Sequence, residues 1–146
     1  MKTFASMAIV LAIATPALAQ QIPPPTIFTI RSGETLQLVF QTSVTNDCTV
    51  TWDRYDDVDV LDGPQEITLD GKPTKGTVNL TSGKVCPHEV PGVSITIAAK
   101  DIAEPKEAKL TIRIRFHLRS GRPWQATHRY HLLMFPAADV PQASKQ

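Results

Sequence analysis

Apolar and polar side chains alternate along this chain in a series of short runs. The clearest run covers residues 109–119, where every second residue is apolar: Leu110, Ile112, Ile114, Phe116 and Leu118. An alternation with a period of two places all the apolar side chains on one face of a β-strand, whereas a helix needs an apolar residue every three or four positions. This run therefore predicts a strand with one buried face and one solvent-facing face.

Weaker runs of the same kind occur elsewhere, at Thr26–Ile30, residues 36–41, residues 48–53, Gln65–Leu69, Thr77–Leu80, Val93–Ala99 and Thr127–Phe135. No stretch after residue 19 combines a sustained helical period with capping residues. The dipeptide Asp70-Gly71 is typical of a turn and predicts that the strand before it ends there. We predict an all-β chain with a single antiparallel Ig-like β-sandwich of about seven to nine strands over residues 26–136, and a β-barrel as the alternative.

The first 19 residues are typical of a secretory signal peptide, with an early lysine, a short apolar run and small residues before a cleavage site between Ala19 and Gln20. The alternative is a membrane anchor, but the apolar run is shorter than the roughly 20 residues that a membrane-spanning helix needs. We therefore expect a periplasmic or secreted bacterial protein without a membrane span. Residues 20–25 predict an extended proline-rich lead-in, and residues 137–146 predict a disordered tail.

Cys48 and Cys86 are the only cysteines. In an exported protein an even number of cysteines predicts a disulfide. This one would close a loop of about 39 residues and stabilise the fold by roughly 4 kcal/mol. The alternative is a pair of metal-binding or redox-active thiols, but the sequence contains no Cys-x-x-Cys motif.

Charge is distributed unevenly along the chain. The formal net charge is +1, which does not indicate nucleic-acid binding. Residues 47–70 nevertheless contain eight acidic residues and one basic residue, a net charge of −7, and residues 72–131 contain eleven basic and four acidic residues, a net charge of +7. Within the second region, one face of the clearest predicted strand carries Lys109, Thr111, Arg113, Arg115, His117 and Arg119.

This basic face is a candidate surface for an anionic partner, because an arginine guanidinium can form two parallel hydrogen bonds with a carboxylate or a phosphate. Trp124, in the turn that follows, would add an exposed ring for stacking. The predicted binding residues are Arg113, Arg115, Arg119, Arg122 and Trp124. The alternative is that the acidic region lies on a neighbouring strand and neutralises the basic face through cross-strand pairs.

The acidic segment that follows Trp52 is expected to form a solvated loop, in which Asp56, Asp57 and Asp59 are the candidate calcium ligands. Its spacing departs from that of an EF-hand. Each of the four histidines is interpreted as a surface residue. The sequence has no nucleophile elbow and no glycine-rich phosphate-binding loop, so we expect neither enzymatic activity nor a cofactor.

The segment Pro73–Val78, Cys86, the tripeptide Val90-Pro91-Gly92 and the final Phe135-Pro136 resemble exported bacterial Ig-like or cadherin-like β-sandwich domains in their turn residues and strand order. The resemblance covers about half of the chain and implies an adhesive, spacer or recognition module without catalytic residues. We therefore predict a non-enzymatic binding or interaction module of the bacterial cell envelope, whose partner is a protein or an anionic envelope component. The alternatives are a self-assembling structural protein and a small secreted hydrolase that uses the acidic segment.

Overall fold

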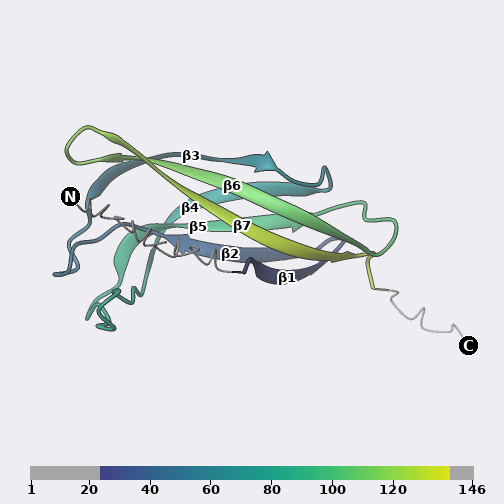
Figure 1. Ribbon diagram of the computed structural model, residues 1–146, viewed down its shortest axis with the longest axis horizontal. Helices are drawn as coiled ribbons and strands as arrows, with labels where there is room; N and C mark the ends of the chain where they lie inside the picture. The colour runs from purple at the N-terminus through teal and green to yellow at the C-terminus, as the bar shows by residue number, and fades with distance from the viewer. Residues whose placement is uncertain (1–23, 139–146) are drawn as a thin grey trace, which may run out of the picture.

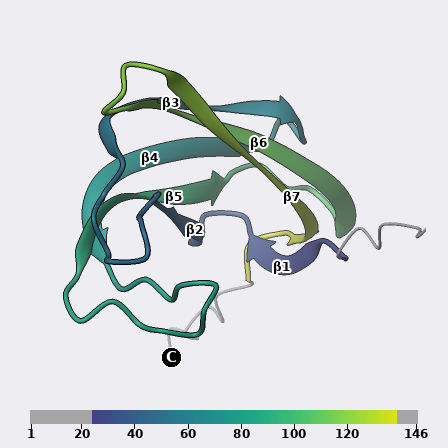
Figure 2. The same cartoon turned by 60° about the vertical axis from the view of Figure 1, so that its left-hand side comes forward.

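The computed structural model describes residues 24–138, which form seven β-strands and no helix (Figure 1). In chain order the strands are β1 (Thr26–Arg31), β2 (Thr35–Gln41), β3 (Trp52–Asp62), β4 (Ile67–Gly76), β5 (Val90–Ala99), β6 (Lys106–Leu118) and β7 (Pro123–Phe135). Sheet A has the strand order β1-β7-β6-β3, and sheet B has the order β2-β5-β4. The two sheets lie face to face (Figure 2), which confirms the predicted β-sandwich.

The core lies between the two sheets and follows directly from the alternation. Ile112, Ile114 and Phe116 of β6 are fully buried, and they pack in one cluster with the fully buried Ile95 and Ile97 of β5. Burial of each such side chain contributes about 1.5–3 kcal/mol. The alternating residues of β6 therefore attach sheet A to sheet B and leave the polar residues between them on the outer face.

One pair of strands runs parallel, because the first and the last strand of the described chain lie side by side. The register of β1 against β7 pairs Thr26 with Tyr130 and Arg31 with Phe135. A short turn then carries the chain from β1 in sheet A to β2 in sheet B, and the other strand pairs are antiparallel. Alternation alone does not reveal the direction of a strand, so the sequence did not predict this pair.

The turn predicted at Asp70-Gly71 is wrong, because β4 continues through both residues to Gly76. Gly71 is needed for packing and not for a turn. A Cβ atom at this position would overlap the hydroxyl group and the ring of Tyr55, which reaches across from β3. An inward-facing glycine in a strand is typical of such a close approach.

The strand predicted at residues 48–53 and the acidic loop predicted after it are also wrong. Cys48 has a φ angle of 66° and lies in a loop, and β3 begins only at Trp52. The acidic segment itself forms β3, which pairs with β6. The β3–β6 register shifts at three points, and each irregularity disturbs the alternation by which a strand is recognised.

The signal peptide predicted at residues 1–19 lies outside the described residues, as do most of the lead-in and most of the tail. Within residues 24–138, no helix is long and apolar enough to cross a membrane. The disulfide between Cys48 and Cys86 is confirmed, with the two Cα atoms 5.8 Å apart.

Candidate functional site: the loop end of the sandwich

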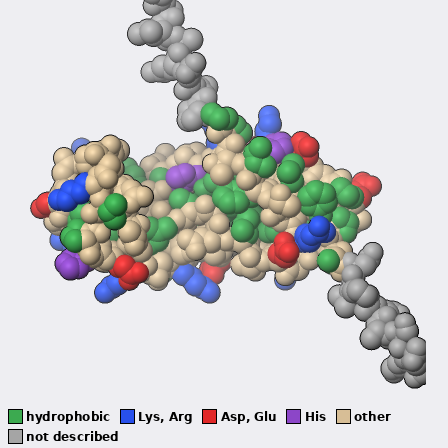
Figure 3. All heavy atoms as spheres, turned by 90° about the horizontal axis from the view of Figure 1, so that it is seen from below, with side chains coloured by type: hydrophobic (Ala, Val, Ile, Leu, Met, Phe, Trp, Pro, Cys, Tyr) green, Lys and Arg blue, Asp and Glu red, His purple; other side chains and the backbone are tan. Residues whose placement is uncertain are grey.

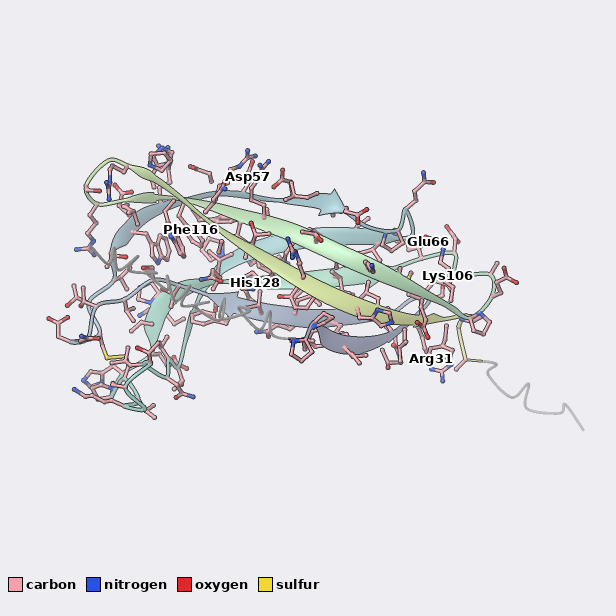
Figure 4. The ribbon with its side chains drawn as sticks, in the orientation of Figure 1. Arg31, Asp57, Glu66, Lys106, Phe116 and His128 are labelled. Carbon is pink, nitrogen blue, oxygen red and sulfur yellow. A yellow bond between two sulfur atoms is a disulfide. The ribbon has the colours of Figure 1, made fainter. Side chains whose placement is uncertain are left out.

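The outer face of sheet A holds the basic stripe that the sequence predicts, and the acidic residues of β3 lie directly beside it. Arg113 donates to both carboxylate oxygens of Asp59, at 2.7 and 3.3 Å, and Arg115 donates to both oxygens of Asp57, one of them at 2.6 Å. These pairs follow from the strand register, which places Asp59 opposite Arg113 and Asp57 opposite Arg115. Asp57 is labelled in Figure 4. The two oppositely charged regions of the sequence meet here as neighbouring strands.

The pKa shifts of Asp57 and Arg115 agree with the geometry of their ion pair. The hydrogen bond from Arg115 is the main cause that lowers the pKa of Asp57, and the same bond raises the pKa of the Arg115 guanidinium. The ionised carboxylate of Asp57 and the guanidinium cation of Arg115 therefore stabilise each other. Arg113 and Arg115 each form an ion pair with an aspartate of the neighbouring strand. This agrees with the alternative interpretation of the charge pattern, in which the acidic region neutralises the basic face.

The three predicted calcium ligands are not arranged as a metal site. Asp57 and Asp59 bind the two arginines, and Asp56 contacts His117, with 2.7 Å between its Oδ2 atom and the Nδ1 atom of the imidazole. Within the described part of the chain, no group of three histidine, cysteine, aspartate or glutamate side chains is close enough to hold a metal ion. The carboxylates are dispersed along a strand, whereas calcium needs six to eight oxygens converging from a loop.

Trp124 also differs from its predicted role. Its ring packs against Phe116, with the two centroids 5.4 Å apart, and it is partly buried beside the core cluster. Trp52 and Tyr55 approach Phe116 from β3, at centroid distances of 5.2 and 5.7 Å. The tryptophan is therefore part of an aromatic cluster at one end of the core and is not a fully exposed ring in the turn.

The remaining predicted binding residues, Arg119 and Arg122, lie in the turn between β6 and β7. Both are exposed, and neither forms an ion pair with another residue in the described range. The amide of Arg119 donates to the carbonyl of Thr51 at 2.9 Å. This bond attaches the turn to the loop that connects β2 with β3.

Two longer loops lie at the same end of the sandwich (Figures 1 and 2). Residues 42–51 fold back on themselves, with a bridge between Val44 and Val50, and residues 77–89 do the same through a bridge between Asn79 and Val85. The disulfide, drawn in yellow in Figure 4, joins the two loops. We call residues 42–51, 77–89 and 119–122 together the loop end.

The loop end is anchored to the core through Thr42. The indole of Trp52, which is 9% exposed, donates to the hydroxyl of Thr42 at 3.0 Å. That hydroxyl donates in turn to the carbonyl of Pro91 at 2.7 Å, at the start of β5. One side chain thus connects both sheets to the first loop, and the disulfide holds the second loop against it. The sequence indicated the disulfide but not which loops it would bring together.

A hollow of about 690 Å³ lies on the outer face of sheet B, next to the loop of residues 77–89. The Phe40 ring covers Gly76 and Gly92, where a Cβ atom would overlap it, and Ser94 and Thr96 continue the floor along β5. Lys72, at its rim, lies 3.3 Å from Asp70. The hollow contains hydroxyl groups and an aromatic ring but no cluster of titratable side chains.

Three of the four histidines, His117, His128 and His131, contact polar side chains. His128 contacts the side-chain oxygen of Gln41 at 2.6 Å, and His131 contacts Glu107 at 3.0 Å. Burial lowers the pKa of His128 and raises the pKa of its neighbour Tyr130 to about 12. Within residues 24–138, no serine, threonine or cysteine is hydrogen-bonded to a histidine, which is the pairing that activates a nucleophile.

Comparison of the chain with protein-family models, with curated proteins and with solved structures finds no match.

Proposed function

We propose that this protein is a non-enzymatic, Ig-like binding module of the bacterial cell envelope, which recognises an anionic partner at its loop end. One observation carries the proposal: three separate loops at one end of the sandwich are connected by the disulfide and by the bond from Arg119 to Thr51. Loops held by a rigid scaffold are where β-sandwiches most often place their binding residues. A cross-linked set of loops loses little conformational entropy when a partner binds.

The strand order supports the Ig-like assignment. In an Ig domain the second, fifth and fourth strands share one sheet, and the third, sixth and seventh share the other. Sheet B has the order β2-β5-β4, and sheet A contains β7-β6-β3 with β1 at its edge. The first strand differs, because the constant-type Ig domain pairs it with the second strand.

We place the site at Arg119 and Arg122 because the other two predicted arginines already form ion pairs within the protein. Arg113 and Arg115 each bind an aspartate on the neighbouring strand, so a partner would first have to break an ion pair. Arg119 and Arg122 are exposed at the tip of a tight turn, at which Gly121 has a φ angle of 84°. These two guanidinium groups are therefore available to bind a carboxylate or a phosphate of another molecule.

The backbone at Cys48 also supports a role for the first loop. Its left-handed conformation is unfavourable for a residue with a side chain by about 1–2 kcal/mol. Strained residues of this kind persist where the surrounding structure fixes them, and they concentrate at binding sites. The disulfide fixes this one, and disulfides persist in oxidising compartments such as the periplasm.

The experiment is a binding assay with two defined anionic probes, vesicles that contain phosphatidylglycerol and beads that carry a carboxylated polysaccharide. The double variant Arg119→Glu/Arg122→Glu should lose most of its binding, because both cations are replaced by anions at the contact surface. The matched control is Lys100→Glu/Lys109→Glu, which makes the same change in net charge at two exposed residues outside the loop end. The control should retain most of its binding.

The comparison of these two variants separates a defined site from general charge attraction. Equal losses in both variants would mean that net charge alone governs binding, and the loop-end site would be wrong. Wild-type protein that binds neither probe would refute recognition of a phosphate- or carboxylate-bearing envelope component at the loop end.

A further inference from the structure

Phe40 lies on the outer face of sheet B and not in the core. In the β2–β5 register it is opposite Ser94, whereas the neighbouring Val93 and Ile95 of β5 face inward and belong to the core cluster. The Phe40 ring is partly buried, but it does not pack against that cluster. Within residues 24–138 it also stacks on no other aromatic ring. The ring therefore does not serve to join the two sheets.

Two glycines on neighbouring strands make room for this ring. A Cβ atom at Gly76 of β4 would lie 2.9, 2.9 and 3.0 Å from three consecutive ring carbons, and one at Gly92 of β5 would also overlap the ring. Nearly equal distances to three ring carbons place that Cβ position above the centre of the ring, so one face of Phe40 is turned toward Gly76. Glycine inside a strand is typical of such a close approach. The opposite face of the ring is directed away from this glycine.

Hydroxyl and amide groups line the hollow beside the ring. Ser94 is opposite Phe40 on one side and Lys72 on the other, and Thr96 is opposite Gln37. Thr96 donates to a main-chain carbonyl at 3.5 Å. The side chains of Gln37 and Ser94 form no hydrogen bond with any other residue in the described range. Both groups can donate and accept, so they are available to a ligand that does the same.

We infer that the hollow is a carbohydrate-binding site, in which one sugar ring of a polysaccharide stacks on Phe40 while the sugar hydroxyl groups bond to Gln37 and Ser94. A pyranose ring whose hydroxyl groups are all equatorial has only C–H groups on its two faces, and such a face packs well on an aromatic ring. The hydroxyl groups around its edge both donate and accept, as the side chains beside Phe40 do. The volume of about 690 Å³ lies within the range of roughly 300–1,000 Å³ that is usual for ligand pockets.

The charge of the hollow favours an uncharged sugar over a phosphate or a carboxylate. Lys72 lies 3.3 Å from Asp70, so among the described residues Lys75 is the one cation lining the hollow without an ion pair. Sites that attract anions are typically lined by several charges of one sign. On the side of the molecule seen from below in Figure 3, charged groups of both signs are likewise dispersed. The sugar site is therefore distinct from the arginines of the loop end and does not depend on the function proposed for them.

The test is a titration of the protein with two uncharged oligosaccharides, cellohexaose and N-acetylchitohexaose, by calorimetry and by amide chemical shifts. Binding of at least one of them should shift the amide signals of Gly92, Ser94 and Thr96. Phe40→Leu should weaken that binding by roughly tenfold or more, as truncation of a central aromatic contact does. Leucine remains an apolar cover for the glycines but has no flat face. Phe40→Tyr keeps the ring and should retain most of the affinity.

The matched control is Phe135→Leu, because Phe135 is also a partly buried phenylalanine but lies at the end of β7 in sheet A. Its ring centroid is 5.5 Å from the guanidinium carbon of Arg31. This variant should bind both oligosaccharides as the wild type does. Equal losses in Phe40→Leu and Phe135→Leu would overturn the assignment of the site to the hollow.

A second variant covers the case in which Phe40→Leu does not fold, which urea denaturation would show. Gln37→Ala/Ser94→Ala keeps the ring and removes two hydrogen-bonding groups from the outer face, so it should weaken binding by about fivefold or more. An unchanged affinity in this variant would contradict the proposed contacts to the sugar hydroxyl groups.

Two results with the wild-type protein would overturn the inference. One is the absence of binding to both oligosaccharides, and the other is binding that leaves the amide signals of Gly92, Ser94 and Thr96 unchanged. Arg119→Glu/Arg122→Glu should bind the oligosaccharides normally, and Phe40→Leu should bind anionic vesicles normally. The sugar site and the anion site can therefore fail independently of each other.

Discussion

The two faces of β6 are built from alternating residues of one strand, yet they depend on their surroundings in different ways. On the inner face Leu110, Ile112, Ile114 and Phe116 are 0% exposed, and each is in contact with the core cluster. On the outer face the side chains of Arg113 and Arg115 remain 29% and 41% exposed, although each binds an aspartate of β3. The inner face attaches one sheet to the other, and the outer face attaches one strand to its neighbour.

This difference in burial predicts a difference in energy. Apolar burial scales with the area removed from water and needs no specific partner. An ion pair that is still in contact with water gains little, because solvent screens the attraction and two long side chains become ordered. The inner face should therefore account for most of the stability of the sandwich, and the outer face should mainly define which strands pair and in which register.

The largest effect is expected from Phe116→Ala. The substitution removes the ring at the centre of the aromatic cluster, against which Trp52, Tyr55 and Trp124 pack. We expect the free energy of unfolding to fall by about 3–5 kcal/mol, measured by urea denaturation. Ile114→Val, one methylene smaller, should cost about 0.5–1.5 kcal/mol and remains measurable if the first variant does not fold.

The matched control on the outer face is Thr111→Ala, which lies next to the core residues Leu110 and Ile112 but on the opposite side of the strand. A surface substitution of this kind should change the free energy of unfolding by less than about 0.5 kcal/mol. Comparable losses for Phe116→Ala and Thr111→Ala would contradict the assignment of stability to the inner face.

The sequence predicted the inner face because its alternation is local. Each apolar residue of β6 is two positions from the next, so a single strand contains all the information that is needed. The disulfide was likewise predictable, since only one pair of cysteines exists. Six of the seven strands overlap such runs, and β3, which shares only residues 52–53 with one, is the exception.

The outer face was less predictable because it depends on a neighbour distant in sequence. Their opposite net charges indicated that the acidic and basic regions would attract each other. The three shifts in the β3–β6 register, however, interrupt the two-residue alternation by which β3 could have been recognised as a strand. Gly71 shows the same limit, since the close approach of Tyr55 comes from another sheet. The grouping of Arg119 with two disulfide-linked loops is also a property of the assembled sandwich.

The second prediction concerns pH and extends the comparison to a histidine on the inner side of β7. Burial lowers the pKa of His128, so below its ordinary value of 6.5 the unfolded chain binds a proton that the folded chain does not. The free energy of unfolding should therefore decrease as pH falls below about 6.5.

Urea denaturation as a function of pH provides the measurement. His128→Gln should flatten the decrease below pH 6.5, and His88→Gln, at an exposed histidine of the loop end, should leave it in place. A second decrease should appear at more acidic pH, below the ordinary value of 3.8 for aspartate. There the protonation of Asp57, whose pKa the Arg115 hydrogen bond lowers, removes its stabilising charge. An unchanged profile in His128→Gln would assign the first decrease to other groups.

The smallest effect is expected from the pair Arg113–Asp59, tested by a double-mutant cycle with Arg113→Gln and Asp59→Asn. The coupling energy should be about 0.2–1 kcal/mol and should decrease with added salt, because the pair is partly exposed. A contact that defines the register must have a coupling energy that is small but not zero. In a shifted register an arginine would lie opposite another arginine, which is unfavourable. A coupling of zero would mean that Arg113 is free to bind a partner, and the whole basic face would again compete with the loop end as the binding surface.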